Sequence, residues 1–260
     1  IAVSDVGAIV QGSPVAGLNV PGAANGDDLG FSVAGAGDMN NDGFSDVIMG
    51  APNATDPDGR RSGAVYVLFG SDSGLGTNGV VNLPALSPKR GFRIYGENDG
   101  DQLGRSVSGA GDVNGDGIDD IVMGAPFADF RLATPSNPSA PPSTDEGAAF
   151  VIYGHPDYGT VDGPLEAELK KLSNAVFSGG TTESPDKLEF TPIMPEEGGL
   201  DVAINPENDL LNTLTGQLPG CRVRGEGGEM GASVAGIGDF NGNGIADFVG
   251  RPTGSACAVR

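Results

Sequence analysis

The nine residues 38–46, DMNNDGFSD, decide how this chain is interpreted. They place Asp38, Asn40, Asp42 and Asp46 at loop positions 1, 3, 5 and 9, with glycine at position 6. In a tight loop, alternate side chains converge on one point, and glycine permits the sharp reversal of the backbone. Together with the backbone carbonyl of Phe44 at position 7, these oxygens suit Ca²⁺, which takes about 6–8 oxygen ligands. The stretch therefore predicts a calcium loop.

The same pattern occurs three times, within the longer stretches 28–52, 102–126 and 230–252. The second ligand set is Asp112, Asn114, Asp116, the Ile118 carbonyl and Asp120, and the third is Asp239, Asn241, Asn243, the Ile245 carbonyl and Asp247. The first two loops supply three carboxylates each, whereas the third supplies two because Asn243 takes position 5. Since ligand charge tunes calcium affinity, we expect two stronger sites and one weaker site.

The loop is not an EF-hand, although the spacing of its first residues is similar. An EF-hand requires a bidentate Glu at position 12, and here that position is Met49, Met123 or Gly250. The residues that follow the first two loops, Val47-Ile48 and Ile121-Val122, favour a strand over a helix. We therefore expect each loop to join two strands of a β-hairpin. A turn rich in Asp and Asn that binds nothing is the competing interpretation, and three matching copies disfavour it.

Further β-rich runs follow the loops, at residues 63–70 and 147–154, and the first is followed by another at 92–96. Each unit is thus interpreted as four short strands. A repeated four-stranded unit that buries its faces against its neighbours is typical of a β-propeller blade. The predicted fold is all-β, with blades of four antiparallel strands.

Two segments do not fit the plain repeat. Residues 128–146 are rich in Pro and Ser and are expected to form a surface loop. Residues 156–219 are interpreted as an insertion with a short helix at 164–172, where apolar residues have helical spacing. The alternative, a poorly matching fourth blade with a strand at 200–204, stays open.

Composition limits the partners. The formal net charge is -21, which argues against nucleic acid, because binding phosphates requires clustered Lys and Arg. No run of 18 apolar residues predicts a membrane-spanning helix. The two cysteines, Cys221 and Cys257, are too few for a disulfide scaffold, and a single disulfide and two free thiols both stay open.

These residues carry a family resemblance. Leu-Gly-x-Ser-Val, followed by the calcium loop and then Gly-Ala-Pro, resembles the FG-GAP repeat of the integrin α-subunit β-propeller and its bacterial secreted relatives. The resemblance implies that the strand before each loop is the innermost of its blade and that the ions lie on one face of the ring. Ser32, Ser106 and Ser233, with the three residues after each, would then line the channel.

The chain departs from the family in its number of blades. The family's ring usually has seven blades, and this chain has material for three or four. The third repeat replaces Gly-Ala-Pro by Gly-Arg-Pro at 250–252. We divide the chain into residues 1–29, whose strands complete a neighbouring or the C-terminal blade, 30–155 with two blades, the insertion 156–219, and 220–260 with an incomplete third repeat. A fragment, an arc completed by another chain and a disrupted reading frame all stay open.

Catalysis is the main competing class of function. Gly30-x-Ser32 and its two counterparts resemble the start of a nucleophile elbow, but its last glycine is replaced by Ala34, Ser108 and Ala235. The single histidine, His155, is expected in a turn and leaves no paired-histidine centre.

We therefore predict a non-catalytic calcium-binding module for adhesion or protein recognition, and expect a hydrolase least. A structural subunit of a larger assembly is the alternative, with an oligomer that completes the propeller. Calcium is abundant outside the cytosol, so we expect an extracellular, cell-surface or periplasmic location with protein partners.

Overall fold

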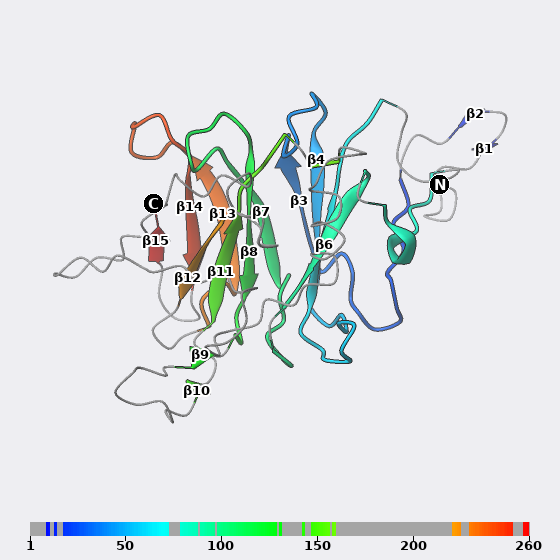
Figure 1. The fold of residues 1–260 in the computed structure, drawn as a ribbon, viewed down its shortest axis with the longest axis horizontal. Helices are drawn as coiled ribbons and strands as arrows, with labels where there is room; N and C mark the ends of the chain where they lie inside the picture. The colour runs from blue at the N-terminus through cyan, green and yellow to red at the C-terminus, as the bar shows by residue number, and fades with distance from the viewer. Residues whose placement is uncertain are drawn as a thin grey trace.

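The structure is a computed structural model of residues 1–260. It describes residues 9–10, 13–14, 18–72, 79–87, 89–96, 98–128, 130–131, 142–143, 147–156, 158–159, 220–224, 229–251 and 257–259. Within these residues the chain is nearly all β, which confirms the predicted fold class (Figure 1), and the helical element they contain is the short 3-10 turn η2, Leu83–Ala85. The helix expected at 164–172 and the alternative strand at 200–204 lie outside the described residues.

The strands form three main antiparallel sheets, each a simple meander. The first blade contains β3 (Ser32–Gly37), β4 (Asp46–Ala51), β5 (Ala64–Leu68) and β6 (Gly91–Tyr95). The second contains β7 (Ser106–Gly111), β8 (Asp120–Ala125), β11 (Ala148–Ile152) and β12 (Gly220–Arg224). The third contains β13 (Ser233–Gly238), β14 (Asp247–Arg251) and β15 (Cys257–Val259). Two short hairpins pair β1 (Ile9–Val10) with β2 (Ser13–Pro14), and β9 (Phe130–Arg131) with β10 (Pro142–Ser143).

The boundary of the third repeat differs from the expected one. Strand β12 pairs with β11 in the register Ala148↔Arg224, so residues 220–224 complete the second blade. The insertion therefore lies between the third and fourth strands of that blade, and the third repeat starts after Arg224 rather than at Gly220. The physical reason is that β11 is buried along its whole length, and its backbone groups need hydrogen-bond partners on both edges.

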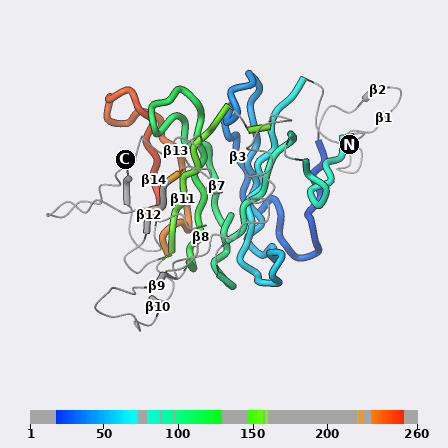
Figure 2. The backbone as a smooth tube through the Cα atoms, viewed as in Figure 1, coloured from blue at the N-terminus to red at the C-terminus, as the bar shows by residue number. Residues whose placement is uncertain are grey.

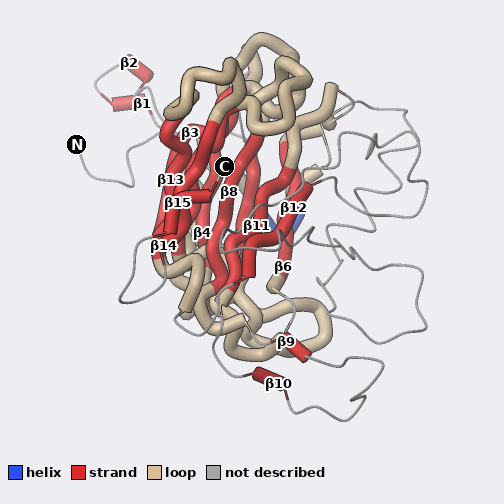
Figure 3. Tube along the Cα trace, turned by 90° about the vertical axis from the view of Figure 1, so that its left-hand side faces the viewer, coloured by secondary structure: helices blue, strands red, loops and turns tan. Residues whose placement is uncertain are grey.

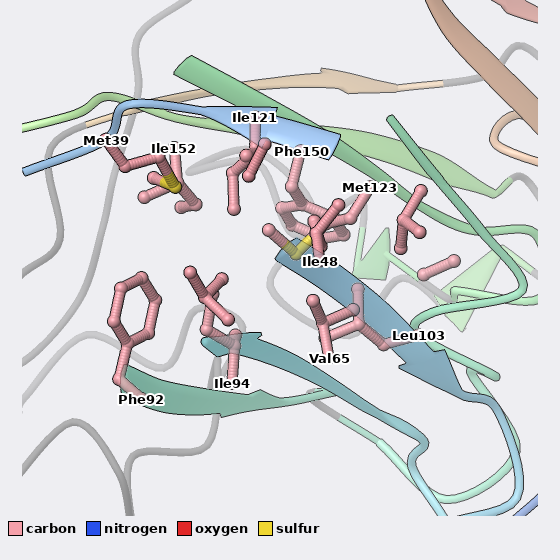
Figure 4. Packing of buried hydrophobic residues seen from close by; sticks show 14 of the residues in the cluster. Met39, Ile48, Val65, Phe92, Ile94, Leu103, Ile121, Met123, Phe150 and Ile152 are labelled. Atoms are coloured by element: carbon pink, nitrogen blue, oxygen red, sulfur yellow. The ribbon is translucent and has the colours of Figure 1, made fainter. Parts of the chain in front are cut away.

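The three blades stack side by side, with the first and third on opposite sides of the second (Figure 2). One apolar cluster joins the first and second blades, with Ile48 and Val65 of the first packing near Ile121 and Met123 of the second (Figure 4). A second cluster joins the second blade to the third and contains Val113 and Phe248. The hydrophobic core thus lies between blades, since a single sheet cannot bury both of its faces.

Serines at the start of β3 and β7 fasten neighbouring blades at the backbone. The Ser32 hydroxyl donates to the Gly104 carbonyl oxygen at 2.8 Å, and the Ser106 hydroxyl donates to the Gly231 carbonyl oxygen at 2.8 Å. The Leu-Gly-x-Ser parts of the first two repeats therefore link each of these blades to the one that follows it.

The glycine of Gly-Ala-Pro has a steric role in the same contact. A Cβ atom at Gly50 would collide with the Gly104 carbonyl oxygen, and one at Gly124 would collide with that of Gly231. The backbone of the following blade thus approaches too closely for any side chain at this position.

The N-terminal segment lies against the first blade. Leu18, Val20, Ala23 and Leu29 pack against a cluster that includes Tyr66 on the face turned away from the second blade. Within the described part of this segment that follows the β1–β2 hairpin, Asn19 forms an isolated β-bridge with Val80. The described part of the segment thus covers the first blade, and the completion of a neighbouring or the C-terminal blade by strands of residues 1–29 stays a prediction.

Matched valines test the stacking of the blades. Val107 is buried between the first two blades, whereas its counterpart Val33 is 62% exposed. We expect Val107→Ala to lower the free energy of unfolding by about 2 kcal/mol, from lost apolar burial and a residual cavity. Val33→Ala should change it by less than about 0.5 kcal/mol, as exposed substitutions do. Urea unfolding measures both, and equal losses would contradict the packing.

Candidate metal-binding loops

The three predicted loops lie along one edge of the stacked blades, at the top of Figure 1. Each joins the first and second strands of its blade, and each preceding strand has a β-bulge, as at Gly35/Gly37. Figure 3 shows loops gathered at both ends of the strands, and these three belong to the upper end. The residues predicted from sequence are therefore brought together loop by loop, on one edge of the molecule.

The aspartate at position 1 organises each loop through backbone amides. In the first loop, Asp38 Oδ1 accepts the amide of Asp42 at 3.0 Å, and Oδ2 accepts that of Gly43 at 2.8 Å. Asp112 and Asp239 accept the corresponding amides in the other two loops. Asp and Asn favour such local bonds, which explains why the same residue types recur in the turn.

Positions 3 and 5 repeat a second set of bonds. Asn40 Oδ1 accepts the amide of Asp42 at 3.3 Å, and Asp42 Oδ1 accepts the amide of Phe44 at 2.9 Å. The second loop has the same bonds through Asn114 and Asp116, and the third through Asn241 and Asn243. The residues at position 7 thus turn their amides into the loop, which fixes the turn of the backbone around the side-chain oxygens.

The aspartate at position 9 is buried, and in the first two loops its carboxylate accepts two backbone amides at the base of the loop. Asp46 Oδ2 accepts the amide of Met39 at 2.8 Å, and Oδ1 accepts that of Gly70 at 2.8 Å. Asp120 accepts the amides of Val113 and Gly154 in the same way, each at 2.8 Å. This bracing role was missed in the sequence, where position 9 was interpreted only as a ligand.

In the third loop the same aspartate, Asp247, has different partners. It accepts the amide of Phe240 at 2.9 Å, but both its oxygens also accept the side-chain amide of Asn241. In the first two loops the Asn side-chain amide instead donates to the position-5 carboxylate. The replacement of that carboxylate by Asn243 removes this acceptor, so the third loop is arranged differently.

Asp46 and Asp120 are buried, and no positively charged side chain among the described residues pairs with them. Burial, with a smaller contribution from the other carboxylates of each loop, raises the pKa of Asp46 to about 6 and that of Asp120 to about 8. The amides that Asp46 and Asp120 accept only partly offset this. No ion pair reaches the loop carboxylates from the described residues, where Arg60 pairs instead with Asp56 and Asp58. A cation at these loops would supply the missing charge.

The donor chemistry of the loops fits a hard cation, although the carboxylates are not already clustered. Within the described ranges, no three Asp, Glu, His or Cys side chains gather closely enough to hold a metal. The oxygens of an ionised carboxylate offer about four lone-pair sites, so those accepting two amides retain capacity for an ion. Amide and carbonyl oxygens at positions 3 and 7 would have to complete the shell, as expected for calcium rather than for zinc.

Neighbouring loops are also hydrogen-bonded to each other. The amide of Asp38 donates to Asp119 Oδ2 of the second loop at 2.9 Å, and the amide of Ala246 in the third loop donates to the Asp112 carbonyl at 2.9 Å. The loops therefore form one continuous edge rather than three separate turns.

The candidate catalytic residues have structural roles. The hydroxyls of Ser32 and Ser106 are used in the links between blades. His155 lies in a turn, since its carbonyl accepts the amide of Tyr158, and its own amide donates to the Met39 carbonyl. The Tyr158 ring, which sequence reasoning did not identify, is fully buried beside Phe69 and Phe92. Tyr158 and His155 thus fasten the end of β11 to the first blade.

Comparison with known proteins identifies the repeats. The FG-GAP repeat family matches residues 29–68 and 103–152. The chain is 34% identical over 179 residues to integrin alpha pat-2 of Caenorhabditis elegans, covering 65% of this chain and 13% of that protein. It is 34% identical over 134 residues to mouse integrin alpha-E, covering 47% of this chain and 11% of that protein. It is 37% identical over 102 residues to human integrin alpha-6, covering 39% and 8%. The chain thus spans only a small part of these relatives. Among the described residues, no helix has the length and apolar character needed to cross a membrane.

The raised pKa values predict how stability depends on pH without calcium. The folded state binds the protons of Asp46 and Asp120 more tightly than the unfolded chain, in which the pKa of Asp is about 3.9. Their contribution is complete below about pH 4 and is lost as pH rises through about 6 for Asp46 and about 8 for Asp120. We expect the melting temperature of the calcium-free protein to fall over this range.

Asp120→Asn should flatten the part of this fall that lies between about pH 6 and 8. Asp72→Asn, which removes an exposed carboxylate, is the matched control and should leave the slope unchanged. An Asp120→Asn slope equal to that of the wild type would show that the Asp120 carboxylate does not titrate in this way.

Proposed function

From the premise that the chain carries FG-GAP repeats like those of integrin α-subunits, we propose that it is a non-catalytic calcium-binding module for adhesion or protein recognition. The observation that carries the calcium part is the loop with a buried aspartate at position 9. In the first two loops, Asp46 and Asp120 combine burial, nearby carboxylates and the absence of a basic partner among the described residues.

Calcium would be held by the oxygens at positions 1, 3, 5, 7 and 9 of each loop. In the first loop these belong to Asp38, Asn40, Asp42, the Phe44 carbonyl and Asp46. When bound, the ion would neutralise carboxylates that otherwise repel one another at the end of each hairpin. Binding to the folded state alone stabilises it by mass action, so we expect calcium to raise the melting temperature.

The recognition part of the proposal rests on the relatives. The similar proteins are integrin α-subunits, and the FG-GAP repeat family matches residues 29–68 and 103–152 of this chain. We infer an extracellular or cell-surface location, with a periplasmic one as the bacterial counterpart, because free calcium is plentiful there. The bound partner is inferred to be a protein, since a net charge of -21 disfavours nucleic acid.

Calorimetry with calcium on chelator-treated protein tests the metal part. We expect binding at three sites, two stronger and one weaker, accompanied by a higher melting temperature. The position-5 residue distinguishes the loops, so Asp116→Asn should weaken the second site by about tenfold, or about 1.4 kcal/mol. The reciprocal change Asn243→Asp should strengthen the third site by a similar factor.

Two outcomes would contradict the calcium proposal. The first is the absence of heat and of any thermal shift at millimolar calcium. The second is binding that neither exchange at position 5 alters, because the ions would then bind elsewhere. Magnesium at equal concentration is the control, and we expect it to bind more weakly because it demands a smaller, more regular shell.

A further inference from the structure

Position 8 of the second loop reaches across to the first loop. Asp119 holds this position, and its Oδ2 accepts the backbone amide of Asp38, position 1 of the first loop, at 2.9 Å. The Asp119 side chain also lies beside Gly37, where an added Cβ atom would collide with the Asp119 carboxylate. Gly37 has a φ of 74°, a left-handed conformation that glycine adopts without strain. The junction between the two loops is therefore packed too closely to admit a side chain at residue 37.

The same positions meet at the junction between the second and third loops. Ala246 is position 8 of the third loop, and its amide donates to the carbonyl oxygen of Asp112, position 1 of the second loop, at 2.9 Å. A Cβ atom at Gly111, the counterpart of Gly37, would lie 2.9 Å from the Ala246 Cβ. Contact between position 8 of one loop and position 1 of the preceding loop thus recurs. Of these two junctions, the first uses a side-chain carboxylate and the second a backbone amide.

A backbone connection runs beside the Asp119 contact. The Gly154 amide donates to Asp120, position 9 of the second loop, at 2.8 Å. The amide of the next residue, His155, donates to the carbonyl oxygen of Met39, position 2 of the first loop, at 2.8 Å. The base of the second loop is therefore tied to the start of the first loop through two consecutive residues, in addition to the Asp119 carboxylate.

The Asp119 contact joins residues that organise both loops. The carboxylate of Asp38 accepts the amides that turn the first loop, and Asp119 itself lies between two expected calcium ligands, the Ile118 carbonyl and Asp120. We propose that Asp119 couples the first two calcium sites, so that an ion in the second loop raises the affinity of the first loop for calcium. This inference rests on the calcium function proposed above and makes Asp119 a positioning residue, since it is not one of the predicted ligands.

The coupling follows from shared ordering. An ion that draws the Ile118 carbonyl and Asp120 together restrains the residue between them, and the Asp119 carboxylate then holds the Asp38 amide in place. Part of the entropy cost of ordering the first loop is thereby already met when the second loop is occupied. Repulsion between the two ions opposes this effect, and the negative charge of Asp119 at the junction offsets part of the repulsion. Linkage requires the first ion to strengthen the second site by the same factor.

Calcium titration followed by amide NMR tests the coupling, because the Gly43 and Gly117 amides, at position 6 of the first two loops, report each site separately. Asp112→Asn combined with Asp116→Asn removes two carboxylates and disables the second site. With Asp119 present, this change should weaken the first site about fivefold. In the Asp119→Ala background it should weaken the first site by less than about twofold.

Two further variants separate the contact from its charge and from its loop position. Asp119→Asn keeps an oxygen acceptor and loses the charge, so it should retain part of the coupling. Ser45→Ala, at the exposed position 8 of the first loop, is the matched control and should leave the coupling unchanged. A dispersed amide spectrum shows that each variant is folded.

Deuterium exchange of the Asp38 amide tests the contact without any metal. In the calcium-free protein, Asp119→Ala should speed this exchange at least about tenfold, because the amide loses its acceptor. Ser45→Ala should change the exchange rate by less than about twofold. An Asp38 amide that exchanges equally fast with and without the Asp119 carboxylate would overturn the proposal.

The outcomes of the titration separate this proposal from the calcium proposal. Gly43 and Gly117 signals that do not move at millimolar calcium would overturn both. Signals that move, with a first site that is unaffected by disabling the second, would overturn the coupling alone. An effect of the second site that persists undiminished in Asp119→Ala would also overturn it, because another contact, such as that of His155, would then transmit the coupling.

Discussion

The buried aspartate at the end of each nine-residue loop is the interaction on which the rest of the structure depends. In every repeat its carboxylate accepts the amide of loop position 2, as Asp46 does from Met39. That bond holds the end of the second strand against the start of the loop. The residue at position 2 is thereby directed into the contact with the following blade, where Met39 and Val113 are buried.

One residue type thus connects electrostatics with packing. Burial removes the carboxylates of Asp46 and Asp120 from water, which disfavours their ionised form and raises the pKa of both. A cation at the loop would remove that penalty and strengthen the contacts that position 2 makes between blades. Calcium binding and blade stacking are therefore expected to support each other, although each rests on separate observations.

Much of the fold was predictable because the same sequence pattern occurs three times. The loop, the flanking strands of the first two blades and the stacking of blades follow from the periodic pattern and from the Gly-Ala-Pro signature. Strand β12 was not assigned correctly, because a long insertion separates it from its partner β11, and distant pairing leaves no local signal. The packing of Leu18 and Val20 on the first blade was unpredictable for the same reason.

The candidate site was predictable in its residue types and less so in its geometry. Spacing alone identified the oxygens of positions 1, 3, 5 and 9, but not which of them accept backbone amides. Asp46 and Asp120 each accept a backbone amide from Gly70 and Gly154, respectively, which lie after the third strand of each blade and far from the loop in sequence. The signal that could have found them is the Gly that follows the strands at 64–68 and 148–152 in both blades.

The most direct test of this account is a crystal structure of the protein grown with calcium, with anomalous scattering measured at long wavelength. If the loops hold calcium, an anomalous peak is expected in each of the three, with oxygens of positions 1, 3, 5, 7 and 9 around it and the weakest peak in the third. Loops without a peak, in which Asp46 and Asp120 keep only their amide bonds, would contradict it and leave these aspartates a purely structural role.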